Sequence, residues 1–520
     1  MNLFRLLSLL LAFAHTAAAV AGSVRVGDVL WHYPLDNPAE LQSGSGGREI
    51  IQELGRGSVL LITNRNPLET VLRTFTLPIE TLRGRFVFMG ADVKAENVSA
   101  KAKPWNGIKL MVRIDTPTGP QWPQAEIPIG SFGWQRFSTR ILVPTNATAV
   151  TLVLGLEQVS GRVVFDELRL TLAREVATAL DAPSDQPIFR GHALPRLRGA
   201  MISPRSLTEK DIAVLAQDWG ANLVRWQLIR NKVPPNEAGF TAYDQWLEDE
   251  LARLDRGLVW AGKMGVKVVV DLHSPPGGKA TSSGYQAAIG SLWTDPGAQA
   301  KFIEVWRKIA ARYKDDSRVW GYDLVNEPDD SNVAEGCDDW QDLALRAGRA
   351  VRETDPSRTL IVEPPSWGSA QGFVGFQPIP LTNTIYSFHM YIPTEFTHQG
   401  VFSPSRPITY PGRIAGVMWD QAALEKAIGP AIDFARRYRV HMYVGEFSAI
   451  RWALGGDKYL DDVIGIFEAH GWDWTYHAFR EWDGWSVEHG SDKDNHQPAM
   501  EPTARQKILL KWFRKDRVNR

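Results

Sequence analysis

Cysteine is almost absent from this sequence, since Cys337 is the only one among 520 residues. A disulfide within the chain needs two cysteines, so the fold must be stabilised by packing of apolar side chains. A chain of this length can supply that packing. Cys337 has no metal-binding or redox motif around it, and we interpret it as a structural residue.

Excess charge of one sign and long apolar runs are also missing. Lys and Arg number 58, Asp and Glu number 59, and the formal net charge is -1. This balance argues against nucleic acid or an anionic membrane surface as a partner, because both attract concentrated positive charge. No stretch approaches the about 20 apolar residues that a membrane-spanning helix requires. Neutral polymers remain open as partners.

The N-terminal residues contain one short apolar run. Arg5 supplies a positive charge, Leu6 to Ala14 are mainly apolar, and Ala19-Val20-Ala21 has the small-x-small pattern of a signal-peptidase site. The run is too short to span a bilayer. We therefore predict a signal peptide over residues 1–21, a secreted or periplasmic mature protein, and no membrane attachment after cleavage.

Two patterns divide the rest of the chain, and the first is a repeated alternation of apolar and polar side chains over residues 22–175. Ile108 and Leu110, for example, alternate with Lys109 and Met111. A period of two buries one face of a strand and exposes the other, so seven or eight such runs predict an all-β sandwich. Residues 176–195 contain Asp181-Ala-Pro-Ser-Asp-Gln-Pro and no clear period, which predicts a linker.

From residue 196 to residue 516 the pattern changes to strands that alternate with helices. Leu251 and Leu254 belong to a stripe at helical spacing, whereas the strands are short, nearly continuous apolar runs, as parallel strands covered on both faces should be. Eight strand–helix units predict a (β/α)8 TIM barrel rather than an open sheet. Ser206 and Glu209 predict a capping box before the first helix. The predicted strands are Leu197–Ile202, Asn222–Trp226, Val266–His273, Val319–Asn326, Thr359–Glu363, Ile385–Tyr391, Val440–Glu446 and Trp474–Arg480.

In a barrel of this kind, functional side chains lie at the carboxyl ends of the strands and in the loops that follow. Six of the predicted strands carry polar residues near that end, which is more than structural accident explains. They are Arg225 on the second strand, Asp271 and His273 on the third, Asn326 and Glu327 on the fourth, His389 and Tyr391 on the sixth, Glu446 on the seventh, and Arg480 to Trp485 on the eighth.

Two of these residues, Glu327 and Glu446, suit the hydrolysis of a glycosidic bond. One carboxylic acid must give a proton to the leaving oxygen, and the other must be ionised to attack the anomeric carbon. Retention of configuration requires the two carboxyl groups to be about 5–5.5 Å apart. Arg225 is the candidate cation that keeps one of them ionised. Tyr391 is a candidate donor to that same carboxylate, and Asn326 a candidate for binding a substrate hydroxyl.

The strand-end sequences resemble those of glycoside hydrolase family 5. Asn326-Glu327-Pro328, Gly445-Glu446-Phe447, Asp271-Leu-His273 and His389-Met-Tyr391 carry the resemblance, which covers the whole barrel. It implies a retaining mechanism with Glu327 as acid/base and Glu446 as nucleophile, and no metal or organic cofactor. It also implies that several neighbours support or bind the substrate, namely Arg225, His273, Asn326, His389 and Tyr391.

The resemblance further implies an aromatic residue after the eighth strand, beneath the sugar at the cleavage point. Trp482 is our prediction for this residue, and Trp485 is the alternative. Trp367, after the fifth strand, is a second candidate sugar platform. Glu363, at the end of the fifth strand, is a rival carboxylate to which we assign a structural or substrate-orienting role. Glu481 is predicted to point away from the site.

The N-terminal sandwich is similar to the jelly-roll carbohydrate-binding modules that are attached to such barrels. The similar stretches are Phe132-Gly-Trp134-Gln-Arg-Phe137 and Val163-Val-Phe165-Asp166-Glu-Leu. This resemblance implies glycan binding, and the alternative is a domain that only braces the barrel. Trp105 and Trp122, in polar or Pro-rich loops, are the candidates for stacking on sugar rings.

We therefore predict a retaining glycoside hydrolase that acts on a polysaccharide or oligosaccharide, with endo-β-1,4-glucanase as the leading assignment. A β-mannanase, a β-1,3-glucanase, an exo-acting enzyme or a transglycosylase of the same fold are alternatives, because subsite loops set specificity and composition does not. A non-catalytic sugar-binding barrel is the alternative from another class. We expect a monomer without a cofactor.

Overall fold

The computed structural model describes residues 27–33, 35, 48–175, 187–230, 239–278, 291–331, 333–402 and 406–516. The predicted signal peptide and the first part of the predicted linker lie outside these residues. The chain divides into two compact units, residues 1–176 and residues 177–520. Each unit contains hydrophobic clusters of its own.

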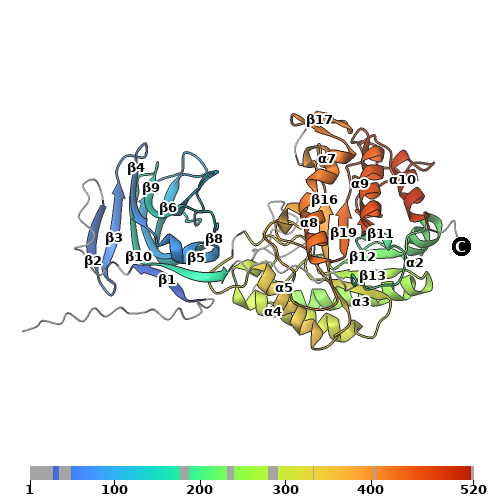
Figure 1. Ribbon diagram of the computed structural model, residues 1–520, viewed down its shortest axis with the longest axis horizontal. Helices are drawn as coiled ribbons and strands as arrows, with labels where there is room; N and C mark the ends of the chain where they lie inside the picture. The colour runs from blue at the N-terminus through green and yellow to red at the C-terminus, as the bar shows by residue number, and fades with distance from the viewer. Residues whose placement is uncertain are drawn as a thin grey trace, which may run out of the picture. The chain divides into compact units, whose positions relative to one another are not determined.

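The first unit consists of two antiparallel sheets (Figure 1). One sheet has the strand order β2-β3-β10-β5-β8 with β1 paired to β10, and the other has the order β4-β9-β6-β7. This all-β architecture confirms the prediction for the N-terminal region. The elements are β1 (Val29–Tyr33), β2 (Arg48–Glu53), β3 (Gly57–Asn64), β4 (Thr70–Thr76), α1 (Ile79–Leu82), β5 (Arg85–Val98), β6 (Gly107–Thr116), β7 (Gly119–Gln121), β8 (Gly130–Val143), β9 (Ala149–Glu157) and β10 (Gly161–Glu175).

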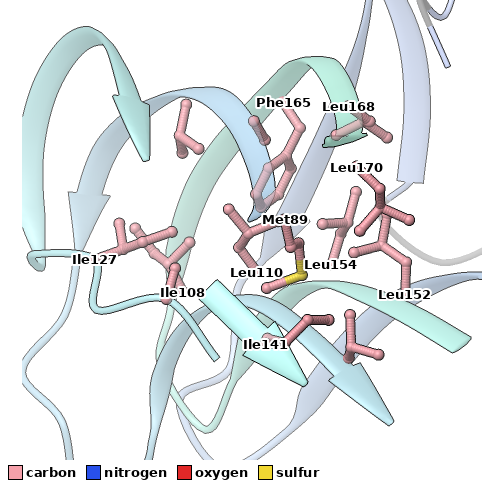
Figure 2. Packing of buried hydrophobic residues seen from close by; sticks show 14 of the residues in the cluster. Met89, Ile108, Leu110, Ile127, Ile141, Leu152, Leu154, Phe165, Leu168 and Leu170 are labelled. Atoms are coloured by element: carbon pink, nitrogen blue, oxygen red, sulfur yellow. The ribbon is translucent and has the colours of Figure 1, made fainter. Parts of the chain in front are cut away.

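The apolar faces of both sheets contribute to one core. Met89 and Phe165 come from the first sheet, Leu110 and Leu152 come from the second, and Figure 2 shows them packed together. Along β6, Leu110 is buried in this core whereas Arg113 is exposed, as the alternating pattern predicts. Each fully buried leucine contributes about 1.5–3 kcal/mol relative to an exposed one.

The second unit is built on a closed barrel of eight strands. Every neighbouring pair is parallel, and each strand coincides with one of the eight predicted runs. The predicted (β/α)8 barrel is therefore confirmed. In barrel order the strands are β11 (Arg198–Ile202), β12 (Leu223–Gln227), β13 (Lys267–Asp271), β14 (Val319–Asp323), β15 (Thr359–Val362), β16 (Thr384–Met390), β19 (Met442–Phe447) and β20 (Asp473–Tyr476).

Helices alternate with these strands along the chain and surround them (Figure 1). The predicted apolar stripe of α3, which includes Leu251 and Leu254, is buried. Within the described ranges, no helix combines the length and the apolar character needed to cross a membrane. The helices are α2 (Glu209–Ala213), η1 (Val214–Trp219), α3 (Thr241–Lys263), η2 (Ser291–Trp293), α4 (Pro296–Tyr313), α5 (Trp340–Arg352), η3 (Ala370–Phe373), α6 (Thr394–Thr397), α7 (Gln421–Ala427), α8 (Gly429–Tyr438), α9 (Gly456–His470) and α10 (Ala504–Phe513), with a hairpin of β17 (Gly412–Ile414) and β18 (Val417–Trp419) before α7.

The predicted capping box at Ser206 and Glu209 is wrong. Helix α2 begins at Glu209, so Thr208 is its N-cap, and the Thr208 side chain accepts a hydrogen bond from the Asp211 N–H. The Thr208 N–H in turn donates to the Asp211 carboxylate at 2.8 Å. An N-cap directly precedes the first helical residue, and Ser206 lies two residues too early.

Candidate active site

The predicted site residues meet at the carboxyl-terminal mouth of the barrel. Arg225 lies on β12, His389 on β16 and Glu446 on β19, while Glu327 and Tyr391 follow soon after β14 and directly after β16. Parallel strands of a closed barrel end at the same rim. Residues as far apart in sequence as Arg225 and Glu446, 221 positions, are therefore hydrogen-bonded to each other.

The Glu446 carboxylate is buried and receives two close hydrogen bonds. Arg225 Nη1 donates to Oε1 at 2.7 Å, and the Tyr391 hydroxyl donates to Oε2 at 2.8 Å. His389 Nδ1 and His477 Nδ1 lie 3.7 and 3.8 Å from Oε2. Burial by itself would raise the pKa of Glu446, but the two histidines and Arg225 outweigh it and hold that pKa well below its usual range. Glu446 is therefore an ionised carboxylate.

The Glu327 carboxyl group differs from Glu446 in its exposure. The accessible fraction of the side chain is 29% for Glu327 and 5% for Glu446. His389 Nδ1 lies 2.9 Å from Glu327 Oε1, and one carboxylate oxygen of each glutamate lies within 4.8 Å of the other. This spacing is shorter than the about 6.5–9.5 Å that separates two carboxyl groups when a water nucleophile acts between one of them and the sugar.

Glu363 contacts Glu327 and two of the residues around Glu446. Glu327 has a left-handed backbone with φ of 48°, which is uncommon for a non-glycine residue, and its N–H donates to Glu363 Oε2 at 2.8 Å. The other oxygen, Oε1, lies 3.0 Å from Arg225 Nη2 and 3.1 Å from His389 Nε2. Because Glu363 is fully buried, its contacts are those of a residue that orients its neighbours.

Arg225 is completely buried among four carboxyl groups. Besides its contact with Glu446, the guanidinium lies 3.2 Å from Asp271 Oδ1, 2.9 Å from Asp323 Oδ2 and 3.0 Å from Glu363 Oε1. Burial opposes the charged form, but the surrounding carboxylates raise the pKa of Arg225 well above its usual range. One cation cannot balance four negative charges in a dry site. Accordingly, burial raises the pKa of Asp323 well above its usual range.

His273 and Asn326 extend the network from β13 to β14. His273 Nδ1 lies 2.9 Å from Asp271 Oδ2, and His273 Nε2 lies 3.2 Å from Asn326 Nδ2. Asn326 Oδ1 accepts a hydrogen bond from Arg225 Nη2 at 3.0 Å. With the Asn326 amide as donor, His273 accepts at Nε2 and donates from Nδ1 to Asp271. These contacts order one wall of the site.

Two residues after β20 enter the site although the sequence did not predict it. His477 directly follows the strand, and its Nδ1 lies 2.5 Å from the Tyr391 hydroxyl while its Nε2 lies 3.5 Å from Glu481 Oε1. Glu481 Oε2 also accepts from Gln227 Nε2 at 2.8 Å. The prediction that Glu481 points away from the site is therefore wrong, because the chain turns after β20 and brings its carboxylate back towards β12. The predicted eighth strand extends to Arg480 and so places His477 inside it, whereas β20 ends at Tyr476.

Three tryptophans surround the mouth with different exposure. Trp367 is 50% exposed, Trp482 is 42% exposed and Trp485 is 8% exposed. The Trp482 ring meets those of Trp485 and Trp452 edge-on at 5.9 and 6.3 Å. The Trp367 N–H donates to the carbonyl of Pro328, beside Glu327. Trp367 and Trp482 have rings available for stacking, and their contact with a sugar stays a prediction.

His398, on the loop after β16, completes an aromatic wall. Its ring meets those of Tyr391 and Trp485 at 5.0 Å each and stacks on Phe402 at 5.8 Å. Burial lowers the pKa of His398 to about 4, so this ring is neutral around pH 7.

Two clusters of described residues have donor atoms that suit a metal ion. They are Glu327, His389 and Glu446 at the mouth, and His192, His441 and Asp473 near the amino ends of the strands. In the second cluster both histidine Nε2 atoms lie 2.7 Å from the same Asp473 oxygen, which is the length of a hydrogen bond. Hydrogen bonding within the protein accounts for both clusters, and the expected lack of a cofactor stays a prediction.

Comparison with known proteins relates this barrel to cellulases. The family model described as Cellulase (glycosyl hydrolase family 5) matches residues 182–482. Endoglucanase C of Acetivibrio thermocellus is 27% identical over 303 residues, which cover 52% of this chain and 84% of that protein. Cellodextrinase A of Ruminococcus flavefaciens is 28% identical over 280 residues, which cover 53% of this chain and 79% of that protein.

A solved structure is also similar. Endoglucanase Cel5A of Thermotoga maritima shares 23% identity with a TM-score of 0.45, over 60% of this chain and 96% of that one. The family model covers more than half of the chain and spans every predicted site residue from Arg225 to Trp482. The chain belongs to glycosyl hydrolase family 5, the cellulase family, and is a glycoside hydrolase that acts on O-glycosyl bonds.

Proposed function

We propose that this protein hydrolyses β-1,4-glucan chains by double displacement with retention of configuration. Glu446 is the nucleophile in this proposal, and Glu327 is the acid/base. The observation that carries it is a pair of unlike carboxyl groups within 4.8 Å of each other. Glu446 is buried among cations that keep it ionised, whereas Glu327 is more open to solvent and to a leaving group.

The two steps use the two glutamates in turn. Glu446 attacks the anomeric carbon while Glu327 gives its proton to the glycosidic oxygen, so that the carbon–oxygen bond breaks and the leaving sugar departs as an alcohol. Glu327, now ionised, takes a proton from water, whose oxygen attacks the anomeric carbon and releases Glu446. Arg225 and Tyr391 hold the two oxygens of Glu446 in position for both steps.

His389 is placed to stabilise the carboxylate of Glu327 between the two steps. Burial would lower the pKa of His389, but Glu363 and Glu446 outweigh it and raise that pKa well above its usual range. The imidazolium Nδ1 donates to Glu327 at 2.9 Å. It therefore stabilises the ionised form of Glu327 that acts as base in the second step.

Two observations support β-1,4-glucan as the substrate. Similar proteins are named an endoglucanase and a cellodextrinase, and the exposed rings of Trp367 and Trp482 suit stacking on the apolar faces of glucose units. Hydrolysis of a mannan or a β-1,3-glucan and transfer of the glycosyl group to a sugar acceptor use the same chemistry and are the alternatives within it. A barrel that binds sugar without turnover is the alternative from another class.

Product release from a panel of polymers tests the proposal. Carboxymethylcellulose, mixed-linkage glucan, laminarin, mannan and xylan are incubated with the wild type and with Glu446→Gln. We expect reducing ends from the first two polymers with the wild type and none with the variant. Activity on mannan or laminarin alone would overturn the substrate, and equal activity of the variant would overturn the role of Glu446.

We also propose that the N-terminal unit binds a glycan. Trp105 and Trp122 are both exposed and lie near the same stretch of β6. Lys109 of that strand donates to the Trp105 carbonyl and, at 2.9 Å, to the side chain of Gln124, two residues beyond Trp122. Two exposed indole rings close to one sheet offer a stacking surface for a sugar chain.

Retention on insoluble cellulose tests this binding role. The double variant Trp105→Ala, Trp122→Ala should elute earlier than the wild type, whereas Leu54→Ala, which removes an exposed apolar side chain in the β2–β3 turn, should not. Equal retention of all three proteins would show that the unit does not bind cellulose through these rings.

We further propose that the protein is exported. The support is the N-terminal sequence pattern of a charged residue, an apolar run and a small-x-small site at residues 19–21. Expression of the full chain in a bacterial host should yield extracytoplasmic protein that begins at Gly22, and an intact Met1 in that fraction would contradict it.

A further inference from the structure

His477 and Glu481 form a polar pair beside Glu446 that the two steps above do not use. The His477 ring packs against the rings of Tyr391 and Trp485, at centroid distances of 6.1 and 5.4 Å. Its Nδ1 faces the Tyr391 hydroxyl and its Nε2 faces Glu481. Glu481 is held in turn by the buried Gln227. Gln227, Glu481, His477 and Tyr391 therefore form one chain of contacts that ends at Glu446.

The positions of the protons define which group donates in each hydrogen bond along this chain of contacts. A tyrosine hydroxyl has one proton, and the contact of 2.8 Å between Tyr391 and the ionised Glu446 uses it. The contact of 2.5 Å between Tyr391 and His477 Nδ1 must then be donated by the histidine. A lone pair on Nε2 would face a carboxylate at 3.5 Å, so Nε2 carries a proton too. His477 is therefore an imidazolium.

We propose that His477 and Glu481 are positioning residues, which fix the Tyr391 hydroxyl as a donor to the nucleophile and place a positive charge beside it. The inference rests on the proposed role of Glu446. It adds two residues to the active site, His477 at the end of β20 and Glu481 in the loop that follows. Neither residue forms a bond with the sugar in the reaction.

The charges around His477 agree with this role. The titratable groups that face it are Tyr391, Glu446, Glu481, Glu327 and His398. Burial opposes the imidazolium, but the surrounding carboxylates outweigh it and raise the pKa of His477. Burial likewise would raise the pKa of Glu481, but His477 outweighs it and lowers that pKa. The pair is therefore stable as an ion pair over a range of pH, and on the alkaline side it is lost when the imidazolium gives up its proton.

The pH profile of kcat/KM for 2,4-dinitrophenyl β-cellobioside tests the inference. This leaving group departs without a proton from Glu327, so the profile reports on the groups around Glu446 in the free enzyme. We expect His477→Gln to lower kcat/KM roughly 100-fold, because it misplaces Tyr391, and to move the acidic limb to higher pH, because Glu446 loses a neighbouring cation.

Glu481→Gln should act differently from His477→Gln. Without the carboxylate, His477 loses its proton more readily, so the alkaline limb should move to lower pH, and kcat/KM below that limb should fall by less than it does in His477→Gln. Glu481→Asp keeps the charge and should restore most of the wild-type profile. If His477→Gln does not fold, Glu481→Gln and Glu481→Asp decide the question.

A second histidine–glutamate pair provides the matched control. His470 Nε2 lies 2.7 Å from Glu425 Oε1 at the end of α9, away from the strand ends that carry the site. His470→Gln and Glu425→Gln should keep the wild-type profile. If the pH profiles of His477→Gln and Glu481→Gln both keep the acidic and alkaline limbs of the wild type, and only KM or Tm changes, the inference is overturned while the proposed function stands. A wild type without activity on the cellobioside, or an active Glu446→Ala, would overturn the proposed function and the inference with it.

Discussion

Arg225 combines a structural and a chemical task in one side chain. Its guanidinium is fully buried and contacts Asp271, Asp323, Glu363 and Glu446. Buried charges are tolerated only when they are paired and hydrogen-bonded. The same contacts that compensate the buried carboxyl groups also place a positive charge beside Glu446. Stability and reactivity therefore depend on one residue.

Substitution of Arg225 should therefore reduce both stability and turnover. Arg225→Gln leaves several buried carboxyl groups without a cation, and we expect a loss of about 3–5 kcal/mol in the free energy of unfolding. Urea denaturation measures it. Arg436→Gln, which removes an exposed ion pair with Asp433, should change this free energy by about 0–1 kcal/mol. A stable but inactive Arg225→Gln would show that the residue acts in catalysis alone.

The two glutamates can be told apart by azide. Removal of the Glu446 side chain leaves space for azide to attack the anomeric carbon directly, so Glu446→Ala should regain some activity and give a glycosyl azide of inverted configuration. Glu327→Ala keeps the nucleophile and should give a glycosyl azide of retained configuration. NMR of the products distinguishes the two. Retained product from Glu446→Ala would mean that the roles are exchanged.

His398 should make the folded protein sensitive to acid. Its pKa is lowered to about 4 by burial, whereas an unfolded histidine has a pKa of about 6.5. The unfolded chain therefore binds a proton that the folded protein rejects. The stability due to the neutral ring is complete above about pH 6.5 and is lost as the pH falls towards 4.

Thermal unfolding of His398→Phe tests this acid sensitivity. Phenylalanine keeps a ring against Tyr391 and Phe402 but does not titrate, so Tm should fall less between about pH 7 and about pH 4 than in the wild type. His470→Phe, at an exposed contact with Glu425, serves as the control for replacing a histidine by phenylalanine. Parallel curves for His398→Phe and the wild type would contradict the assignment.

At the scale of elements, the long loop between β20 and α10 is organised by one side chain. Arg451, which follows β19 and is almost fully buried, donates to the backbone carbonyls of Gly490, Asp492, Lys493 and Asn495 and to the Asp483 carboxylate. A segment without regular structure needs partners for its backbone groups. This one finds them on a guanidinium from the neighbouring strand end, and its partner Asp483 directly follows Trp482 in the sequence.

Arg451→Ala should therefore loosen the loop without unfolding the barrel. Four carbonyls lose a donor, and we expect limited proteolysis to cut within residues 483–496 faster than in the wild type. KM for long oligosaccharides should rise more than kcat falls, because Trp482 is displaced while the glutamates stay in place. Arg436→Ala, which removes an exposed ion pair with Asp433 outside this loop, is the control for loss of one arginine. Equal proteolysis of Arg451→Ala and the wild type would refute the assignment.

At the scale of the whole molecule, the barrel unit contains every residue of the candidate site, and each unit has its own hydrophobic clusters. Domains of this size fold by themselves. We expect residues 177–520, expressed alone, to hydrolyse a soluble aryl β-cellobioside with kcat/KM within about twofold of the full chain. Loss of activity in a folded fragment, shown by circular dichroism, would mean that the first unit completes the site.

Local patterns in the sequence predicted most of the architecture. The eight barrel strands follow from short, nearly continuous apolar runs, and the two antiparallel sheets and the apolar stripe of α3 follow from periodicities of two and 3.6. All of these patterns depend only on contiguous residues. Glu327, His389 and Glu446 were found for the same reason, since each lies near the carboxyl end of a recognisable strand. The capping box failed because a shift of two residues in the helix start changes which side chain is the cap.

Tertiary structure alone decided which side chains meet around the reaction centre. Nothing in the sequence relates Arg225 to Asp323 or Gln227 to Glu481, because those contacts exist only once the barrel closes and brings distant strand ends to one rim. The turn after β20 directs His477 and Glu481 inward, buries Trp485 and leaves Trp482 exposed. Strand periodicity ends at that turn, and the path of the loop, not the spacing of residues, sets where each side chain points.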